Sequence, residues 1–576
     1  GLVNWEDLSV ENVNQVEVLK GAASALYGSS AMNGIINLRT GYAKSTPETE
    51  AAIFTTVWGT PQNEVMQWWG RDTSEIQQPL QSGFSFVHRR KEKKLDVVLS
   101  AYALYRDSYN RNSFSRYGRI SPNLRYRIHD RLTVGLNTNF NFGRSGSFFL
   151  WGNDTNLAMQ PGMNSATQSK GRLRFTVDPT INYFDKNGNQ HKFLSRVYYI
   201  QNNNDNNQSN QSQNYYGEYQ FQRKFQKSNI VITAGMVGVY NHTKAKLYSD
   251  GAFSLTNYAT YLQLDKKFFE RLNVSAGLRY EGYLLKSPTY VDGDTIPNGT
   301  TKEGKPVMRI GANYQLSQAT YLRASWGQGY RFPTIAEKFI TTNFGVASVV
   351  PNAKLFSETG WSAEFGVKQG FKIREWQGFA DAAFFWSEYN NMMEFNFLLL
   401  PPPRLVGFQS QNIGNTKITG VEFSIVGQGS VFNIPLSLMT GYTKIDPTFR
   451  SFTAVEDSLS SASYNVLKYR FRHSFKFDAE AKFVNEKLSV GTNIVYNSFM
   501  EAIDAVFGVF ITGLQDWRTR NNHGVTIVDV RAGYQFTPRW KASFICSNLT
   551  NKEYSVRPAL LEAPRGYTLR LDYSLK

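Results

Sequence analysis

The sequence lacks several features that would point to a familiar class of protein. Cys546 is the only cysteine in 576 residues, so an intrachain disulfide framework is excluded. No run of about 18 consecutive apolar residues occurs, and this excludes membrane-spanning helices. The formal net charge of +17 comes from Lys and Arg scattered along the chain. Because these residues form no basic block, we expect no nucleic-acid binding, and attraction to lipopolysaccharide explains the charge equally well.

Residues with catalytic or metal-binding chemistry are also few. The six histidines are dispersed and form no metal-binding motif. Ser29 and Ser30 lie in a Gly/Ala-rich turn without a nucleophile-elbow pattern, and Cys546 lies in an apolar stretch typical of a small buried side chain. We therefore expect no enzyme activity, no metal site and no bound cofactor.

Aromatic residues, in contrast, are abundant. They make up 15% of the chain, with 32 Tyr, 41 Phe and 11 Trp. Transmembrane β-barrels place many aromatic side chains in girdles at the two membrane interfaces. The mean hydropathy of −0.40 is compatible with such a barrel. A transmembrane strand needs only about 9–11 residues, which alternate between lipid and lumen.

The chain shows this alternation repeatedly. Apolar and polar residues alternate in segments such as 132–142, 274–281, 474–483 and 567–575. The pattern continues for most of the sequence without an amphipathic helix. An open sheet of that size would expose its edges, so we expect a closed antiparallel barrel. Residues 51–576 give room for roughly 20–24 strands, and we predict about 22.

The beginning of the chain has a different character. Residues 13–40 mix short apolar runs with Gly, Ser and Asn turns, and Ser45, Pro47 and Glu48 are typical of a linker. We predict a small domain over residues 1–43, a linker over 44–50 and the barrel over 51–576. A barrel of this width encloses an open channel unless something fills it. The small domain is therefore predicted to be part of a plug.

Several motifs resemble those of TonB-dependent outer-membrane receptors, in the order that this family has them. Residues 329–333 (GYRFP), 361–368 (WSAEFGVK), 420–422 (GVE) and 548–554 (NLTNKEY) are similar to its barrel signatures. Residues 16–40 closely resemble the end of its plug domain. The plug motif residues are Glu17, Gly21, Tyr27, Gly28, Asn33, Gly34 and Asn37.

The resemblance implies an all-β membrane protein, a transmembrane barrel with the remnant of an N-terminal plug in its lumen. It implies location in the outer membrane of a Gram-negative cell. It also implies active import of a scarce ligand (a siderophore, metal chelate or cofactor), driven by the TonB–ExbB–ExbD complex. The family's coupling box does not occur in these 576 residues. We therefore expect the chain to be processed or incomplete at its N-terminus, and TonB coupling if the missing segment exists.

Two other functions remain open. The first is a glycan or peptide importer of the SusC type, which works with a surface lipoprotein. Members of that type generally have larger barrels, so we place it second. The other is a barrel that transports nothing and serves as a scaffold in an outer-membrane complex.

The charges of the plug motif suggest how the plug is held. Lys20 and Arg39 belong to the plug, whereas Glu364 and Glu422 lie on predicted barrel strands and are expected to face inward. A buried charge without its partner is costly. We therefore predict that these cations meet these carboxylates at the seam between plug and barrel. Gly21, Gly28 and Gly34 are expected to adopt positive φ or to allow close backbone approach.

Two loop segments are candidates for contact with a ligand or partner. Residues 57–69 contain three tryptophans, which could equally belong to an interface girdle. Residues 395–404 (FNFLLLPPPR) are unusually apolar for a loop. The candidate residues, with one arginine of the mid-barrel signature, are Trp58, Trp68, Trp69, Arg331, Phe397, Leu399 and Arg404.

Overall fold

The computed structural model describes residues 5–20, 25–28, 34–70, 78–162, 165–248, 250–291, 294–344, 347–399 and 406–575. Strands dominate this part of the chain. None of its helices has the length and apolar character needed to cross a bilayer.

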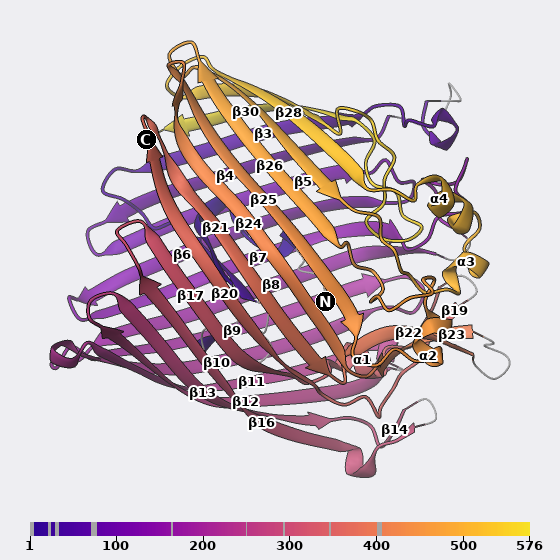
Figure 1. Cartoon of the computed structure of the whole chain (residues 1–576), viewed down its shortest axis with the longest axis horizontal. Coiled ribbons are helices and arrows are strands. Elements are labelled where there is room, and N and C mark those ends of the chain that lie inside the picture. Colours follow the sequence, from indigo (N-terminus) through magenta and orange to yellow (C-terminus); the bar gives the residue numbers. More distant parts are fainter. Residues whose placement is uncertain are drawn as a thin grey trace.

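Within the described residues, 22 antiparallel strands form a closed barrel, as predicted (Figure 1). The barrel closes at β3, which pairs with β4 on one side and with the last strand, β30, on the other. The barrel strands are β3 (Glu48–Trp58), β4 (Leu80–Glu92), β5 (Leu95–Asp107), β6 (Phe114–His129), β7 (Leu132–Phe148), β8 (Ala166–Phe184), β9 (Gln190–Asn204), β10 (Asn210–Phe225), β11 (Ile230–Ala245), β12 (Gly251–Phe268), β13 (Leu272–Lys286), β16 (Thr300–Gln315), β17 (Thr320–Arg331), β20 (Glu358–Ile373), β21 (Trp376–Asn390), β24 (Thr416–Val431), β25 (Ile434–Phe449), β26 (His473–Phe483), β27 (Leu488–Asn497), β28 (Val525–Gln535), β29 (Trp540–Ser547) and β30 (Gly566–Leu575).

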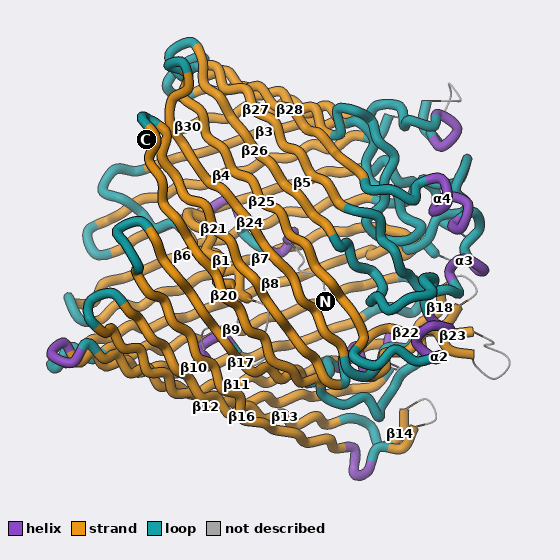
Figure 2. Tube along the Cα trace, viewed as in Figure 1, coloured by secondary structure: helices purple, strands orange, loops and turns teal. Residues whose placement is uncertain are grey.

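The two ends of the barrel differ. Tight connections such as residues 93–94 lie at one end, called here the turn end, with η5 (Gln226–Ser228). Long connections lie at the other, the loop end, on the right of Figure 2. The loop end carries η4 (Glu64–Met66), η6 (Lys246–Tyr248), β14 (Tyr290–Val291), β15 (Asp294–Thr295), η7 (Pro297–Gly299), α1 (Ile335–Phe339), β18 (Thr342–Phe344), β19 (Ala347–Val349), β22 (Met393–Leu399), β23 (Val406–Asn412), α2 (Ala454–Leu459), α3 (Phe507–Phe510) and α4 (Leu514–Arg520).

Strand β7 shows how the alternation of the sequence builds the barrel. Phe140 and Phe142 are 40% and 53% exposed on the outer face, where lipid covers them. Asn141 between them is 1% exposed and donates a hydrogen bond to the backbone of the N-terminal segment inside the barrel. The apolar residues of the predicted segment therefore face outward, and the polar ones face the lumen.

The N-terminal segment lies inside the barrel (indigo in Figure 1). The backbone N–H of Ala25 donates to Gln263 of β12, at 3.3 Å, and Ala25 is fully buried. A Cβ added to Gly277 of β13 would lie 2.6 Å from that of Ala25, so the absence of a side chain there allows the close approach. The segment comprises η1 (Trp5–Asp7), η2 (Val10–Asn12), β1 (Val13–Lys20), η3 (Ala25–Tyr27) and β2 (Gly34–Thr40), with β1 and β2 paired antiparallel.

The loops of the loop end share a hydrophobic core, called here the cap core. It combines residues from the connections that follow β3, β7, β27 and β29. Burial of these large side chains fixes the loops to one another. The buried members are Met66, Trp69, Phe148, Trp151, Ala158, Met159, Met500, Ile503, Ile511, Leu514, Trp517, Ala559 and Leu561.

The outward orientation of Phe140 gives a direct test of the membrane-facing surface. Phe140 lies at the middle of β7, where a lipid-facing arginine costs about 2–4 kcal/mol. We expect Phe140→Arg to lower the free energy of unfolding in lipid vesicles by that amount. Asn137→Arg, on the inner face opposite Asp178, should cost less than about 1 kcal/mol. Equal losses for the two variants, measured by urea titration, would contradict the assigned faces.

Candidate functional site

The seam between the N-terminal segment and the barrel is built from charged pairs. Glu6 of η1 contacts two arginines of the barrel wall, Arg106 at 3.0 Å and Arg172 at 3.3 Å. The Ser115 hydroxyl also donates to this carboxylate, at 3.2 Å. Because β5, β6 and β8 supply these groups, Glu6 connects three strands of the wall.

Two further acidic residues extend this seam. Asp7 pairs with Arg174, and Glu11 pairs with Arg119. The side chains of Arg119 and Glu11 are only 2% and 5% exposed. Arg119 also donates to the backbone oxygen of Glu6, at 2.6 Å. Charges withdrawn from water to this extent need good partners, and here the plug supplies the carboxylates while the barrel supplies the guanidinium groups.

This polarity is the reverse of the one we predicted. Arg39 pairs with Glu17 across the β1–β2 hairpin, at 2.9 Å, and not with a barrel carboxylate. Glu364 of β20 pairs with Arg323 of the neighbouring strand β17, at 2.7 Å. Both residues therefore have ion-pair partners other than those expected.

The other two residues of the predicted seam stay a prediction. Glu422 lies on β24, between Ala383 of β21 and Thr443 of β25. Lys20 ends β1, and its side chain lies outside the described part of the structure. The acidic residues that do hold the plug precede the motif, at positions 6, 7 and 11. The sequence signal available for them was a cluster of acids followed by inward-facing arginines on the first strands.

The glycines of the plug motif behave as expected where they are described. Gly28 has φ +76° and Gly34 has φ +129°, which confirms the predicted positive φ at both positions. The carbonyl of Gly28 accepts a hydrogen bond from Arg309 of β16, at 2.8 Å. Gly21 and Asn33 lie outside the described residues.

The remaining motif residues lie on or beside the plug hairpin. The Asn37 amide donates to Glu17 at 2.9 Å and so reinforces the pair that Glu17 makes with Arg39. Tyr27 is 42% exposed at the end of η3.

A cavity of about 520 Å³ lies beneath the loops of the loop end. Phe395 and Phe408 of the β22–β23 hairpin stack with ring centroids 5.6 Å apart, and Phe408 also contacts Phe507 at 5.4 Å. Connections from widely separated strands contribute to the lining, so the cavity lies over the barrel mouth. The lining residues are Phe149, Leu150, Ser165, Thr167, Gln208, Thr342, Val349, Phe395, Phe408, Tyr469, Met500, Asp504, Phe507, Val556, Arg557 and Pro558.

A buried polar network forms one side of this cavity. Lys468 donates to Asp504 at 2.6 Å and to Asn396 at 2.7 Å, and both charged side chains are at most 5% exposed. The Tyr469 hydroxyl donates to the other oxygen of Asp504. Burial raises the pKa of Tyr469, and the charge of Asp504 raises it further. The phenol is therefore neutral, and the network fixes the β22–β23 hairpin to the loops before β26 and β28.

A second cavity of about 760 Å³ adjoins the first, and Met500, Arg557 and Pro558 line both. Its lining is richer in cations, with Arg518, Arg520 and Lys552. Arg557 lies between the two cavities, with its guanidinium 5.3 Å from the Phe149 ring centroid. Burial lowers the pKa of Arg557, while the charge of Glu562 opposes that shift. The pair of cavities thus combines an aromatic compartment with a cationic one.

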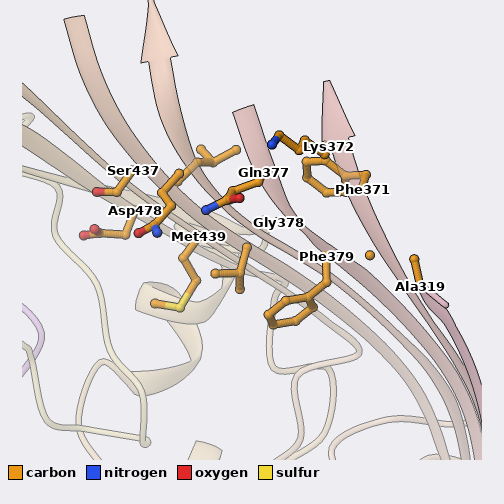
Figure 3. Close-up of a pocket in the computed structure, with 14 residues that line it drawn as sticks. Ala319, Phe371, Lys372, Gln377, Gly378, Phe379, Ser437, Met439 and Asp478 are labelled. Carbon is orange, nitrogen blue, oxygen red and sulfur yellow. The ribbon is translucent and has the colours of Figure 1, made fainter. Parts of the chain in front are cut away.

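A third hollow, of about 690 Å³, lies near the turn end on β20, β21, β24 and β25. Figure 3 shows Gln377, Ser437, Met439 and Asp478 gathered there from neighbouring strands. It lies at the end of the barrel opposite the cap core. For a ligand arriving from the loop end, the two adjoining cavities offer the closer site.

The predicted tryptophans belong to the cap core and its surroundings. Trp69 is 1% exposed within the core. Trp58 packs edge-on against Tyr109, with ring centroids 5.3 Å apart. Trp68 donates to the backbone oxygen of Tyr109 at 2.6 Å. These side chains fix the position of the β3–β4 connection and are absent from the linings of the two loop-end cavities described above.

The other predicted loop residues have separate locations. Arg331 pairs with Glu337 of α1 at 2.7 Å and with Glu358 at 3.3 Å, and so holds α1 against the barrel rim. The Phe397 ring lies 5.8 Å from Phe408, a cavity-lining residue. Leu399 ends β22, but its side chain is not among the described ones, and Arg404 lies outside the described residues.

These features define a class of protein, the plugged outer-membrane β-barrel. Comparison with family models then identifies the family. Residues 69–549 match "TonB dependent receptor-like, beta-barrel", and residues 1–35 match "TonB-dependent Receptor Plug Domain". The chain belongs to the TonB-dependent receptors. The resemblance seen in the sequence is therefore confirmed, and the barrel lies in the outer membrane with its loop end outside the cell.

Solved structures support the same fold. The siderophore receptor PirA from Pseudomonas aeruginosa is 15% identical, with a TM-score of 0.71, over 100% of this chain and 89% of that chain. The FrpB iron transporter from Neisseria meningitidis (F3-3 variant) is 13% identical, with a TM-score of 0.71, over 98% and 88%. The copper transporter OprC is 14% identical, with a TM-score of 0.72, over 99% and 87%. Comparison with curated protein sequences finds no significant match.

The family implies import driven by TonB-dependent energy coupling, and its members are receptors and transporters. Among the described residues, no group of three or more His, Cys, Asp or Glu side chains is arranged to hold a metal ion.

The buried pair between Glu11 and Arg119 can be tested by removing one charge. Glu11→Gln leaves Arg119 buried without its carboxylate, which costs about 3–5 kcal/mol. We expect faster hydrogen exchange in β1 and β2 and a higher channel conductance in planar bilayers. Glu17→Gln removes a partly exposed pair within the plug and should change neither property. Identical behaviour of the two variants would show that the seam does not hold the plug.

The burial of Lys338 in α1 predicts that the folding stability of the protein depends on pH. Burial lowers the pKa of Lys338 from 10.5 to about 8, and the side chain is 1% exposed. A lysine whose pKa is lower in the folded state binds its proton less readily there than in the unfolded state. Folding stability is therefore lost as the pH falls toward the folded pKa and is constant below it.

The free energy of unfolding should accordingly rise by about 2 kcal/mol between about pH 7.5 and about pH 9.5 because of this residue. Lys338→Met should lack that component, measured as the difference between its pH profile and the wild-type profile in detergent. Parallel profiles would mean that Lys338 is not a buried cation.

Proposed function

We propose that this protein imports a compact, largely aromatic or apolar ligand with an anionic group, of the siderophore, metal-chelate or cofactor class. The observation that carries the proposal is the pair of adjoining cavities beneath the loops. The 520 Å³ compartment presents four phenylalanines, and Arg557 lies where it meets the cationic compartment. The similar solved structures are a siderophore receptor, an iron transporter and a copper transporter, and they support the same class.

The chemistry of the cavity favours this class over a glycan. A sugar chain carries many hydroxyl groups, and each loses its water on burial and needs a polar partner. Nine of the sixteen residues that line the smaller cavity are apolar, four of them phenylalanines, and the polar Tyr469 and Asp504 are already hydrogen-bonded to each other. A lipoprotein-assisted glycan or peptide importer is therefore the second candidate, and a scaffold that transports nothing is the third.

The transport cycle that we propose combines the TonB-dependent coupling of the family with the arrangement of cavity and plug. Ligand bound beneath the loops lies on the extracellular side of the plug. The TonB–ExbB–ExbD complex then displaces the plug, which requires the acidic seam of Glu6, Asp7 and Glu11 to separate from its arginines. These pairs can reform when the pull ends, because both partners stay on the same chain.

The first experiment is native mass spectrometry of the protein purified from outer membranes, read for bound small molecules and for subunits. A bound chelate or cofactor would support the proposal. A stoichiometric lipoprotein carrying a glycan or peptide would favour the second candidate. Other stoichiometric subunits with no small molecule, and no TonB-dependent uptake in cells, would favour the scaffold.

The ligand identified in this way then tests the site. Arg557→Gln should weaken its binding at least about tenfold, because a charge-assisted hydrogen bond contributes about 1.5–3 kcal/mol. Phe408→Ala should also weaken binding, by loss of the stacked wall. Met439→Ala, in the hollow near the turn end, is the matched control and should leave the dissociation constant unchanged. Unchanged binding in the first two variants would place the ligand elsewhere.

A further inference from the structure

A row of cations crosses the outer face of the barrel near its loop end. Arg116 of β6 lies directly opposite Arg144 of β7 in the strand register. Arg144 in turn faces a bulge in β8, where Gly143 pairs with Arg172 and Ser145 pairs with Ser169. Lys170 lies in that bulge and is exposed, as is Arg144.

The alternation of the strands places the two arginines on the outside. Arg119 points into the barrel, where it pairs with Glu11 of the plug. Arg116 is three residues away on the same strand and therefore faces the opposite side. Asn141 likewise points inward to the backbone of η1, so Arg144 faces outward.

This arrangement is unfavourable for the protein alone. Like charges directly opposite each other on neighbouring strands destabilise a sheet. Asp107 compensates in part, since it accepts a hydrogen bond from Arg116 at 2.7 Å. Among the described residues, neither Arg144 nor Lys170 forms an ion pair. Three cations thus share one carboxylate at the edge of the membrane-facing band, and an external anion would relieve their repulsion.

The surface next to the row is apolar. Ile120, Phe142 and Leu173 lie on the same outer face, on β6, β7 and β8, and are 45%, 53% and 40% exposed. In the register, Phe142 neighbours Gly118 on one side and Leu173 on the other. The row therefore caps an apolar strip that faces the acyl chains of the outer leaflet. Its complement is a molecule with phosphate groups directly above hydrocarbon chains.

An aromatic contact positions the first arginine of the row. The guanidinium of Arg116 lies 4.5 Å from the ring centroid of Tyr105 and 5.4 Å from that of Phe114. The Tyr105 hydroxyl donates to Asp107 at 2.9 Å, which keeps the carboxylate on the far side of Arg116 from Arg144. The side chains of Arg144 and Lys170 therefore keep N–H donors that can bind a phosphate.

We propose that Arg116, Arg144 and Lys170 form a binding site for the phosphate groups of lipopolysaccharide on the outer face of the barrel. The acyl chains of the bound lipid cover Ile120, Phe142 and Leu173. This site is separate from the loop-end cavities and independent of the transported ligand. It anchors the barrel to the outer leaflet on the side of β6, β7 and β8.

The test uses the full chain in detergent, titrated with lipid A that carries both phosphates and with dephosphorylated lipid A. Binding is measured by native mass spectrometry. We expect the Arg116→Gln/Arg144→Gln double variant to bind phosphorylated lipid A at least about tenfold more weakly than the wild type. Arg223→Gln is the matched control, since Arg223 is an exposed arginine stacked on Phe225 at 4.7 Å near the turn end of β10. It should bind normally.

Three further measurements test whether the phosphate groups of the lipid bind these cations. The Arg116→Lys/Arg144→Lys variant should keep most of the binding, because it retains both charges. If it binds as weakly as the glutamine variant, attraction between charges is not the cause. Excess inorganic phosphate should not displace the lipid, and displacement would show a simple anion site. Equal binding of phosphorylated and dephosphorylated lipid A would overturn the proposal. Equal binding of phosphorylated lipid A by the Arg116→Gln/Arg144→Gln variant and by the Arg223→Gln control would also overturn it.

Discussion

The closure of the strand ladder between β3 and β30 is the constraint on which the rest of the structure depends. A membrane interior offers no water to satisfy unpaired backbone groups, so a sheet within it must have no free edge. Strand β3 meets this requirement by pairing with β4 on one side and with β30 on the other, so the first and last strands of the barrel sequence lie side by side.

Once the barrel is closed, its interior becomes a confined polar space. The charged side chains of the wall pair there with the plug or with one another. The arginines of β5, β6 and β8 face the acidic residues of η1 and η2, and Arg309 of β16 meets the backbone of the plug. Farther round the wall, Arg323 of β17 is neutralised by Glu364 of β20 and Asp381 of β21. The arginines beside η1 and η2 therefore have partners on the plug, whereas Arg323 has partners on the wall itself.

The sequence was sufficient for the fold and insufficient for the seam. Strand character is local, since the alternation around Phe140 follows directly from the two solvents that β7 separates. The partner of a lumen charge is not local. Glu11 and Arg119 are 108 positions apart, and their meeting depends on how the plug is rotated within the barrel. For the same reason Trp69 could not be assigned from its neighbours, because the core that buries it comes from four separate connections.

The short link between plug and barrel limits what the plug can do. Strand β2 ends at Thr40 and β3 begins at Glu48, so only a few residues separate the moving part from the closing strand of the wall. Even fully stretched, such a segment reaches about 25 Å. The end of the plug nearest β3 is thus tethered to the wall, and any displacement of the plug must be smallest at this end. We therefore expect a path past the plug to open on the side of the lumen away from β3. The channel would then lie off the barrel axis, on the side opposite the closing strand.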